Sequence, residues 1–454
     1  MKADGLNSIE KKAAFSLATV FGLRMLGLFM ILPIFAIYGV ELEGYSPLWL
    51  GVAIGAYGLT QALLQIPMGI LSDKFGRKPI IIIGLIVFLI GSLVAASAES
   101  IYGVVFGRAL QGMGAIASAV LALAADLSRE EQRPKVMATI GMFIGLSFTV
   151  SMVVGPIVAQ SYGLSGVFLF TAILTLMAIF MVQFVVPVSQ NKAPKGDNVA
   201  IPQQVTRLIK HPQLFRLNAG VFILHMILTA SFVTLPTLFV KAGLPLEQHW
   251  SLYLPTLFGS FFLMVPFMIF AIKKGYEKGM FSAAVALLAF TLLALTYHSE
   301  SLVWLVVLMV AFFTAFNYLE ATMPSQLARI APAGVKGSAM GIFTSSQFMG
   351  AFVGGALGGY IAQNLDESAI FMCMAWFAIF WFALSLSMQA YLPSKSYSFS
   401  TPQLNEVESE AVLQKLIKLP GVVEATLVYE ERVAYVKLDV KKTSVQQVKS
   451  LLHS

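Results

Sequence analysis

Charge and cysteine are both scarce in this chain of 454 residues. Asp, Glu, Lys and Arg make up only 12% of it, and Cys373 is the single cysteine. One cysteine excludes a disulfide within the chain, and a lone thiol in an apolar run is typical of inert packing. Hydrophobic residues make up 57% and the mean hydropathy is +0.80, both far outside the range of soluble globular proteins. The composition therefore predicts a polytopic membrane protein.

Residue patterns for catalysis are missing as well. The sequence has no nucleotide-binding loop, no spacing typical of metal ligands and no nucleophile beside a partnered base. The glycine-rich stretch 350–360 follows no strand and precedes no Lys-Ser/Thr pair, so it indicates tight helix packing and not phosphate binding. We therefore expect neither an enzyme nor a bound cofactor or metal.

Long apolar runs dominate what is present, and they predict an all-α body. Each is about 20 residues or more, long enough to cross roughly 30 Å of hydrocarbon. The first run is too long, and lacks the small-residue cleavage pattern, to be a removable signal peptide. Pro33, Pro236, Pro255 and Pro266 are expected to kink their spans. The twelve predicted spans are 13–40, 47–71, 79–98, 101–127, 136–161, 165–188, 217–240, 249–272, 279–297, 301–329, 337–363 and 367–392.

Lysine and arginine are distributed unevenly over the connections between these spans. One side takes the clusters within 2–12, 74–78, 129–135, 273–278 and 329–336, whereas the other side has essentially Lys241 alone. Positive charge is retained on the cytoplasmic side, so we predict that both termini are cytoplasmic. The same asymmetry explains the net charge of +7, which gives no reason to expect nucleic acid as a partner.

A polar stretch divides the apolar runs into two sets of six. Residues 189–216 are predicted to form a cytoplasmic linker between an N-terminal half, 1–188, and a C-terminal half, 217–392. Within the linker, 203–215 fits either a short amphipathic helix on the membrane surface or a solvated tether.

The two halves are related in sequence. PMGILSDKFGRKP (67–79) aligns with PFMIFAIKKGYEKG (266–279), which indicates two six-helix repeats. The second copy replaces three charged residues of the first, because Asp73, Arg77 and Lys78 correspond to Ile272, Tyr276 and Glu277. We therefore expect the charged cluster to be kept in the first half only.

Three stretches resemble signature motifs of the major facilitator superfamily. GILSDKFGRKP (69–79) matches the loop between the second and third helices, and GRALQGMGA (107–115) resembles the motif of the fourth helix. Gly155-Pro156 resembles the antiporter motif of the fifth helix, from which Met142 departs. The resemblance covers roughly residues 10–392 and implies two six-helix halves that act as a secondary transporter in a bacterial inner membrane.

The resemblance also implies a conformational latch, made of Gly69, Asp73, Gly76, Arg77, Lys78 and Asp126. Gly69 allows close approach of a neighbouring helix, and Gly76 allows a tight turn. Asp73 is expected to dock on the start of the eleventh helix near 335–337, where free N–H groups favour an anion. Arg77 is expected to meet Asp126, whereas Lys78 fits the latch or simple positive-inside topology.

Four ionisable residues fall inside predicted spans, where charge is costly and therefore a mark of function. Arg24 either extends to the membrane boundary or faces a cavity. Arg108 is a candidate for proton coupling or for organising the first helix. His225 can take up a proton near neutral pH or pack as a neutral side chain. Glu320 can carry a proton, meet a cationic substrate or pair with an arginine.

The composition changes to that of a soluble domain in the tail, 393–454. Helical periodicity in 408–419 and 444–454, and alternation in 421–430 and 432–440, predict a small ferredoxin-like α+β domain with a first strand near 397–402. The segment 418–439 resembles heavy-metal-associated domains, but the tail has no cysteine. We therefore keep the fold, exclude thiolate metal binding, and expect regulation, self-association or another ligand.

These observations favour a carrier of small molecules. The leading hypothesis is a proton-coupled efflux antiporter for small amphiphilic molecules that works by alternating access. One alternative is an uncoupled facilitator or importer of a small metabolite. A third is a membrane sensor whose helical body binds a ligand and whose C-terminal domain reports it.

Overall fold

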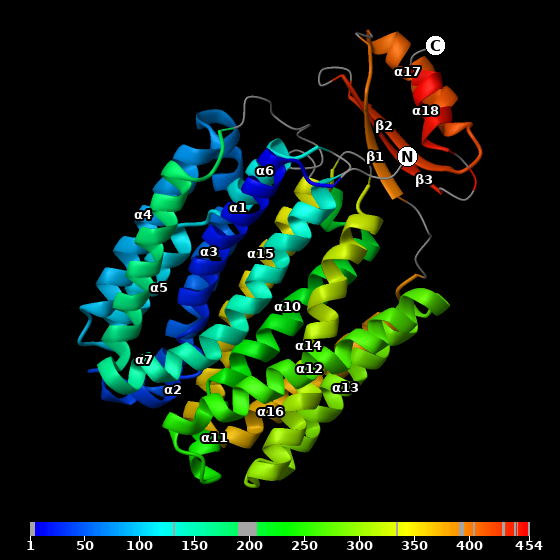
Figure 1. Ribbon diagram of the computed structural model, residues 1–454. Helices are drawn as coiled ribbons and strands as arrows, with labels where there is room; N and C mark the ends of the chain where they lie inside the picture. The colour runs from blue at the N-terminus through cyan, green and yellow to red at the C-terminus, as the bar shows by residue number, and fades with distance from the viewer. Residues whose placement is uncertain are drawn as a thin grey trace.

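The molecule consists of a long helical bundle and a small α+β domain at one end of it (Figure 1). This computed structural model describes residues 5–129, 132–188, 207–332, 335–389, 395–402, 405–428, 432–439, 442 and 444–452. Most of the predicted linker, 189–206, and the predicted hairpin turn at Glu430–Glu431 lie outside the described residues.

Eight helical elements are given by the described residues of the N-terminal half. Their sequences are mostly apolar, so few side chains compete for the hydrogen bonds of the backbone. The backbone N–H and C=O groups therefore bond to each other within long helices. The elements are α1 (Ser8–Phe29), α2 (Phe35–Tyr38), η1 (Gly39–Glu41), α3 (Pro47–Phe75), α4 (Arg77–Ala96), α5 (Ile101–Met113), α6 (Ala117–Asp126) and α7 (Arg133–Phe184).

The C-terminal half is built in the same way. Its elements are α10 (Pro212–Phe232), α11 (Leu235–Lys241), η3 (Leu246–Gln248), α12 (His249–Lys274), α13 (Glu277–His298), α14 (Leu302–Ile330), α15 (Lys336–Asn364) and α16 (Glu367–Leu386). Pro255 and Pro266 lie inside α12, and Pro236 lies in the first turn of α11, just after a break.

Several crossings are interrupted, and the interruptions match residues that disfavour a continuous helix. Pro33 falls between α1 and α2, and Gly114 ends α5. Gly163 takes a φ of 63° inside α7, so this helix makes two crossings. Ten stretches of the described helices are long and apolar enough to cross a membrane; α5 with α6 and α10 with α11 each form one such stretch, and α15 is not among the ten. With α7 as two crossings and α15 as one, the described elements fit the predicted twelve.

The halves meet along α3 and α15 through glycines. A Cβ atom on Gly51 would lie 2.0 Å from the carbonyl oxygen of Gly355, and one on Gly359 would lie 2.4 Å from the carbonyl oxygen of Pro47. Only glycine permits this approach of two backbones. The stretch 350–360 thus packs helices, as its composition predicts.

The C-terminal domain is a three-stranded antiparallel sheet in the order β1-β3-β2, with two helices. Its elements are β1 (Lys395–Ser400), α17 (Glu406–Ile417), β2 (Val422–Val428), β3 (Val433–Leu438) and α18 (Val445–Leu452). Leu416, Val436 and Val448 pack together between sheet and helices. This order of elements agrees with the predicted ferredoxin-like domain.

A hydrogen bond joins this domain to the bundle within the described residues. Lys437 of β3 is 5% exposed, and its Nζ donates to the carbonyl oxygen of Ile330 at the end of α14, at 3.2 Å. Burial is the main cause that lowers the pKa of Lys437, and Lys336 adds to the effect. We call the end of the bundle that carries the domain the domain side, and the opposite end the far side.

Candidate functional site

A polar cluster joins three helices of the C-terminal half. His225 comes from α10, Glu320 from α14 and Gln347 from α15. The Nε2 atom of Gln347 lies 2.8 Å from Nε2 of His225 and 3.3 Å from Oε1 of Glu320. His225 Nε2 lies 3.7 Å from Oε2 of Glu320. Two residues that the sequence singles out separately are therefore brought together by a third.

The hydrogen bonds define the state of the imidazole. His225 Nδ1 lies 3.1 Å from the carbonyl oxygen of Val221, which can only accept, so Nδ1 carries a proton. In the neutral ring Nε2 is then an acceptor, and the amide group of Gln347 donates to it. The second N–H of the same amide points to Glu320. One carboxamide thus serves both titratable groups.

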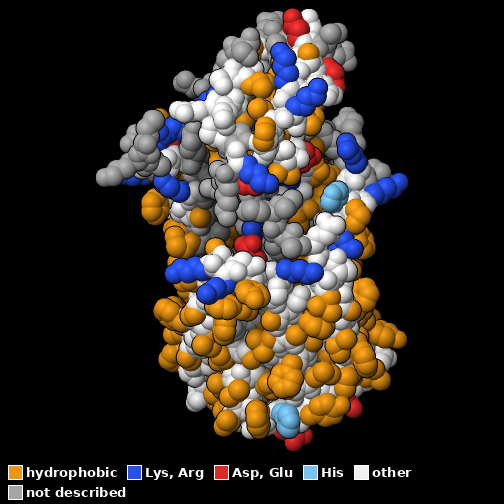
Figure 2. Space-filling view, turned by 90° about the vertical axis from the view of Figure 1, so that its right-hand side faces the viewer, with side chains coloured by type: hydrophobic (Ala, Val, Ile, Leu, Met, Phe, Trp, Pro, Cys, Tyr) orange, Lys and Arg blue, Asp and Glu red, His pale blue; other side chains and the backbone are white. Residues whose placement is uncertain are grey.

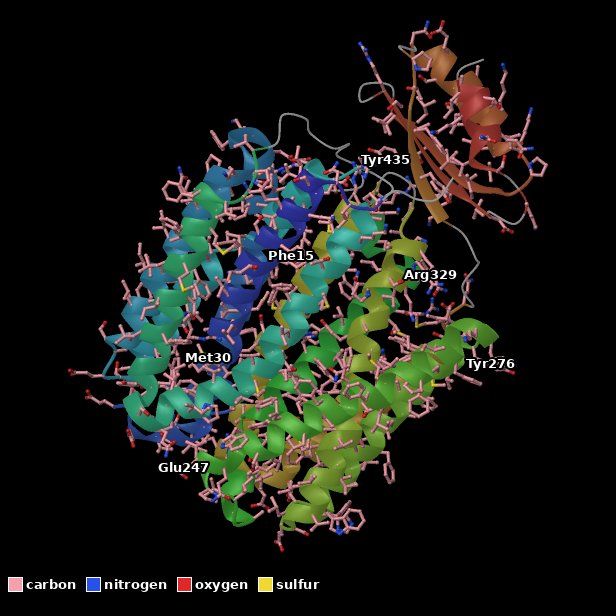
Figure 3. The ribbon with its side chains drawn as sticks, viewed as in Figure 1. Phe15, Met30, Glu247, Tyr276, Arg329 and Tyr435 are labelled. Carbon is pink, nitrogen blue, oxygen red and sulfur yellow. The ribbon has the colours of Figure 1, made fainter. Side chains whose placement is uncertain are left out.

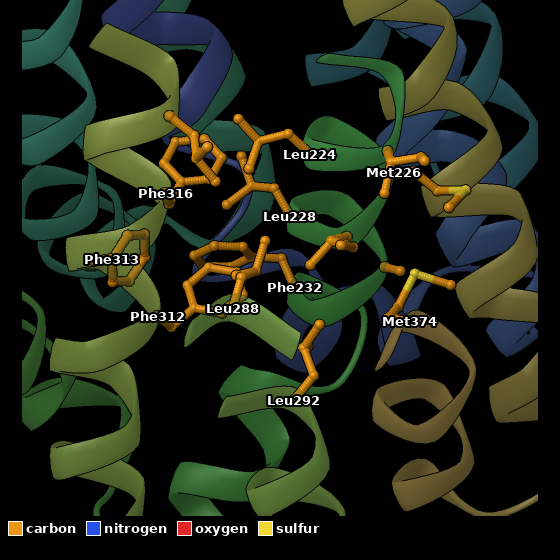
Figure 4. Packing of buried hydrophobic residues seen from close by; sticks show 14 of the residues in the cluster. Leu224, Met226, Leu228, Phe232, Leu288, Leu292, Phe312, Phe313, Phe316 and Met374 are labelled. Carbon is orange, nitrogen blue, oxygen red and sulfur yellow. The ribbon is translucent and has the colours of Figure 1, made fainter. Parts of the chain in front are cut away.

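Aromatic and aliphatic packing holds this cluster in place. Phe316, one turn from Glu320, contacts the imidazole edge-on with ring centroids 5.9 Å apart. Figure 4 shows Phe312, Phe313 and Phe316 of α14 beside Leu224 and Leu228 of α10, in the buried cluster that surrounds the site.

The two ionisable side chains differ in exposure. His225 is 12% exposed, whereas Glu320 is 40% exposed. The carboxyl is therefore less buried than expected for a residue inside a span. Sequence reasoning missed Gln347, because an uncharged amide among Ser345, Ser346 and Phe348 gives no signal of its own.

The N-terminal half contains a buried cation at Arg24. This side chain is 0% exposed, so it does not extend to the membrane boundary. Its Nη2 donates to Oε1 of Gln61 and to the carbonyl oxygen of Gly114, both at 2.9 Å. That carbonyl is available because α5 ends at Met113. Arg24 therefore ties α1 to α3 and to the break in the fourth crossing.

Arg108 lies nearby and is 2% exposed. It donates to Oε1 of Gln111 at 2.9 Å and to the carbonyl oxygens of Ala53 and Ile54 at 3.4 Å. Its hydrogen bonds therefore join α5 to α3, and none reaches the first helix within the described residues. The guanidinium groups of Arg24 and Arg108 lie 5.6 and 5.3 Å from the ring centroid of Tyr57.

The predicted latch residues gather at the domain side. Arg77 lies 2.5 Å from Asp73 and 3.2 Å from Asp126, and it donates to Oγ of Ser72 at 2.7 Å. Gly76 has a φ of 100°, which a side chain would strain. A Cβ on Gly69 would lie 3.1 Å from the Cβ of Ser118.

Lys78 belongs to a different contact. Its Nζ donates to the carbonyl oxygen of Val186 at 2.8 Å, just beyond the end of α7. It therefore ties α4 to the sixth crossing and does not join the carboxylates of the latch.

The geometry limits what the Arg77–Asp126 pair can do. Arg77 begins α4 and Asp126 ends α6, so both lie in the N-terminal half. The expected pair is present, but it cannot by itself hold the two halves together. Only the expected docking of Asp73 on the start of α15 would cross between halves, and that contact stays a prediction.

The second half keeps a charged pair at the matching place, contrary to the expectation from the aligned repeats. Glu277 begins α13 and pairs with Arg329 near the end of α14, at 3.0 Å through both guanidinium Nη atoms. The helices correspond to α4 and α6, but the charges are exchanged. The alignment missed this pair because Arg329 lies outside the aligned segment. Arg329 is labelled in Figure 3 at the domain side.

The motif of the fifth crossing has a packing role. A Cβ on Gly155 would lie 2.6 Å from the carbonyl oxygen of Met30, so this glycine lets α7 approach the end of α1. Pro156 lies inside α7. Met142, where the motif departs from the antiporter pattern, has a side chain that is 63% exposed.

Comparison with protein families and known proteins agrees with this architecture. The model described as Major Facilitator Superfamily matches residues 17–272, and that of the YajR YAM domain matches residues 402–454. The chain is 42% identical over 436 residues to the inner membrane transport protein YajR of Escherichia coli, covering 96% of each chain. It is 25% identical to the quinolone resistance protein NorA of Staphylococcus aureus, covering 78% of this chain and 90% of NorA.

Solved structures show the same fold at low identity. A structure of the nucleoside transporter NupG superposes with a TM-score of 0.65 at 14% identity, covering 83% of this chain and 99% of that one. The matched relatives are transporters and not enzymes. The chain is a multi-pass membrane protein that belongs to the major facilitator superfamily.

Proposed function

We propose that this transporter is a proton-coupled efflux antiporter for small amphiphilic molecules. The observation that carries the proposal is the cluster of His225, Glu320 and Gln347, in which two titratable side chains share one amide. Ionisable groups inside a membrane bundle are costly and persist where they have a function. Histidine and glutamate together provide a site that can take up and release a proton.

The exposure of Glu320 supports exchange at this site. A carboxyl that is 40% exposed can be reached by protons and by ligands, whereas His225 at 12% cannot be reached as easily. If Glu320 binds either a proton or a polar group of the substrate, each displaces the other. Alternating access of such a site to the two membrane surfaces gives antiport.

Aromatic contact between the two halves supports amphiphilic substrates. Phe148 of α7 and Phe313 of α14 face each other between the halves, with ring centroids 6.0 Å apart. Binding sites for amphiphilic molecules are mostly apolar with few polar groups that orient the ligand. The similarity to a protein named for quinolone resistance points in the same direction.

The proposed orientation places both termini in the cytoplasm of a bacterial inner membrane. Figure 2 shows hydrophobic side chains over the helical body on one face, with Lys and Arg gathered where the body approaches the C-terminal domain. Positive residues are retained on the cytoplasmic side. The domain side is then cytoplasmic, and the name of the E. coli relative supports the inner membrane.

Transport in inverted membrane vesicles tests the proposed coupling. The vesicles are acidified inside by respiration, and a pH-sensitive dye reports proton release when each compound of an amphiphilic panel is added. The native protein is expected to release protons with at least one compound, and Glu320→Gln is expected to abolish the release. Glu300→Gln, on the loop between α13 and α14, is the control and is expected to behave as native.

An uncoupled carrier predicts a different result. In that case substrate movement would be independent of the proton gradient, and Glu320→Gln would leave exchange intact. Proton release that is unchanged in Glu320→Gln would contradict the assignment of the proton site.

A further inference from the structure

We propose that Gln347 transmits the protonation state of the His225–Glu320 pair to the contact between the two halves. This inference rests on the proposed function, because it concerns what happens after the pair takes up a proton. Gln347 lies on α15, which packs against α10 of its own half and against α3 of the N-terminal half. It acts as a positioning residue.

The amide of Gln347 must respond when a proton arrives. In the neutral state its two N–H groups donate to His225 Nε2 and to Glu320. A proton on His225 Nε2 turns that atom into a donor, and two donors 2.8 Å apart repel each other. The amide must then rotate to present its oxygen, or move away so that the imidazolium approaches the carboxylate.

A proton on Glu320 has the same kind of effect. The carboxylate loses charge, so the charge-assisted hydrogen bond from Gln347 weakens to an ordinary one. In both cases the amide is the group whose preferred position changes. His225 is held by Val221 at the other ring nitrogen and has less freedom to move.

Among the described residues, the other charged side chains and histidines on the helices packed against the cluster lie toward the helix ends. None of them is hydrogen-bonded to His225 or Glu320, and neither are the phenols of Tyr57, Tyr253 and Tyr318. The charged groups are Asp73 and Lys74 of α3, Arg216 of α10, Lys241 of α11, His249, Lys273 and Lys274 of α12, Glu277, Lys278 and His298 of α13, Arg329 of α14, Lys336 of α15 and Glu367 of α16.

The same turn of α15 touches the N-terminal half. Ser345 Oγ donates to the carbonyl oxygen of Ala62 on α3, at 3.0 Å. Phe348 contacts Tyr57 edge-on, with ring centroids 5.8 Å apart. A Cβ on Gly58 would lie 2.5 Å from the carbonyl oxygen of Phe348, so the backbones are close here. Any displacement of Gln347 along α15 therefore reaches α3 directly.

Tyr57 connects this contact to the interior of the N-terminal half. The cations of Arg24 and Arg108 lie against its ring, and Arg24 also holds the break between α5 and α6. Packed interfaces of this kind shift between discrete arrangements and do not deform continuously. The path from Glu320 to the first four crossings thus runs through Gln347, Phe348 and Tyr57.

Electron paramagnetic resonance distances between spin labels test the inference without a known substrate. The labels replace Lys135 at the start of α7 and Tyr276 before α13, both exposed on the domain side, in a Cys373→Ser background. The purified full chain in lipid nanodiscs is measured from pH 5 to pH 8. One coupled proton is expected to change the ratio of the two distance populations by up to about tenfold per pH unit.

Substitution at Gln347 separates transmission from protonation. Gln347→Met keeps the volume but cannot hydrogen-bond, and it is expected to remove the pH dependence while the titratable pair remains. Gln347→Asn keeps the carboxamide and is expected to retain part of the pH dependence that Gln347→Met removes. Gln363→Met, on the same helix but bonded to Leu48 at the far side, is the control and is expected to titrate as native.

The possible outcomes distinguish this inference from the proposed function. If Glu320→Gln combined with His225→Gln retains the pH dependence, the proton site is wrong. If that double variant loses it while Gln347→Met titrates normally, only the role of Gln347 is overturned. Should Gln347→Met fail to fold, as judged by size-exclusion chromatography, Gln347→Leu takes its place, because it also cannot hydrogen-bond and native titration in it would contradict transmission.

Discussion

At the scale of single residues, this protein uses buried cations whose partners are mostly uncharged. Arg24 and Arg108 are bonded to carbonyl oxygens and glutamine side chains and lie against aromatic rings. Arg77, with two carboxylates within 3.2 Å, and Lys437, 3.6 Å from Glu424, differ in having acidic partners. A buried cation with a paired carboxylate is sensitive to loss of that partner, so the latch is where single substitutions should have large effects.

Asp73→Asn is expected to reduce transport strongly while the protein remains folded and inserted. Arg77 keeps Asp126, so the N-terminal half stays intact, but the negative charge offered to the start of α15 is lost. A contact worth about 1.4 kcal/mol shifts a conformational ratio about tenfold. Reactivity of cysteines placed at the domain-side ends of α6 and α14 should rise, which thiol labelling measures.

The second repeat supplies the control for this prediction. Lys273→Ala and Lys274→Ala change exposed residues before Gly275 and are expected to transport nearly as the native chain does. Normal transport and unchanged labelling in Asp73→Asn would argue against the latch. Failure to insert would show that the charged cluster serves topology.

At the scale of helices, the two repeats place opposite charges at matching ends. Glu277 lies at the N-terminus of α13 and Arg329 near the C-terminus of α14, which is the arrangement that helix dipoles favour. Arg77 at the N-terminus of α4 and Asp126 at the C-terminus of α6 are placed against the dipoles. The helix dipoles therefore oppose the Arg77–Asp126 pair and favour the Glu277–Arg329 pair.

Exchange of the charges in the second repeat tests this difference. Glu277→Arg combined with Arg329→Glu keeps the pair but reverses it against both dipoles. Each helix end favours the native charge by about 0.3–1 kcal/mol at the surface and disfavours the opposite charge by a similar amount, so the exchanged protein is expected to be less stable than the native one by about 1–4 kcal/mol. Thermal unfolding in detergent measures the change.

Single variants provide the reference for that experiment. Glu277→Gln alone leaves Arg329 without its carboxylate and is expected to be less stable than the native protein. An exchanged protein as stable as the native chain would show that the dipoles contribute little here, because the pair is 25–30% exposed and partly screened.

At the scale of the whole molecule, the C-terminal domain rests on a helix end that also carries a charged pair. Lys437 donates to Ile330, the neighbour of Arg329, so the domain sits beside the Glu277–Arg329 pair. Lys437 also lies 3.6 Å from Glu424 of its own sheet. The domain is thus attached at the end of α14.

Deletion of residues 393–454 is expected to leave transport present, with a changed rate. The groups proposed to bind protons and substrate all lie in the bundle, and the domain contributes one described hydrogen bond to it. Uptake into inverted vesicles measures the rate for both proteins. Complete loss of transport in a correctly inserted truncated protein would favour the sensor hypothesis, in which the domain is the output.

Much of the fold is determined by the sequence alone. Runs of apolar residues predict the membrane-spanning helices, and ten described stretches are long and apolar enough to cross a membrane. The motif 69–79 contains Asp73 and Arg77, which form an ion pair in the structure, and the alternation in the tail predicts its strands. These features depend on local composition and spacing, which one sequence displays.

Tertiary structure decided which residues meet. Gln347 joins His225 to Glu320 across three helices, and Arg329 pairs with Glu277 across two. Neither contact leaves a periodic or compositional signal, because it depends on how far each helix is rotated and shifted against its neighbours. That rotation is set by close approaches such as Gly51 on Gly355, which the whole packed bundle determines.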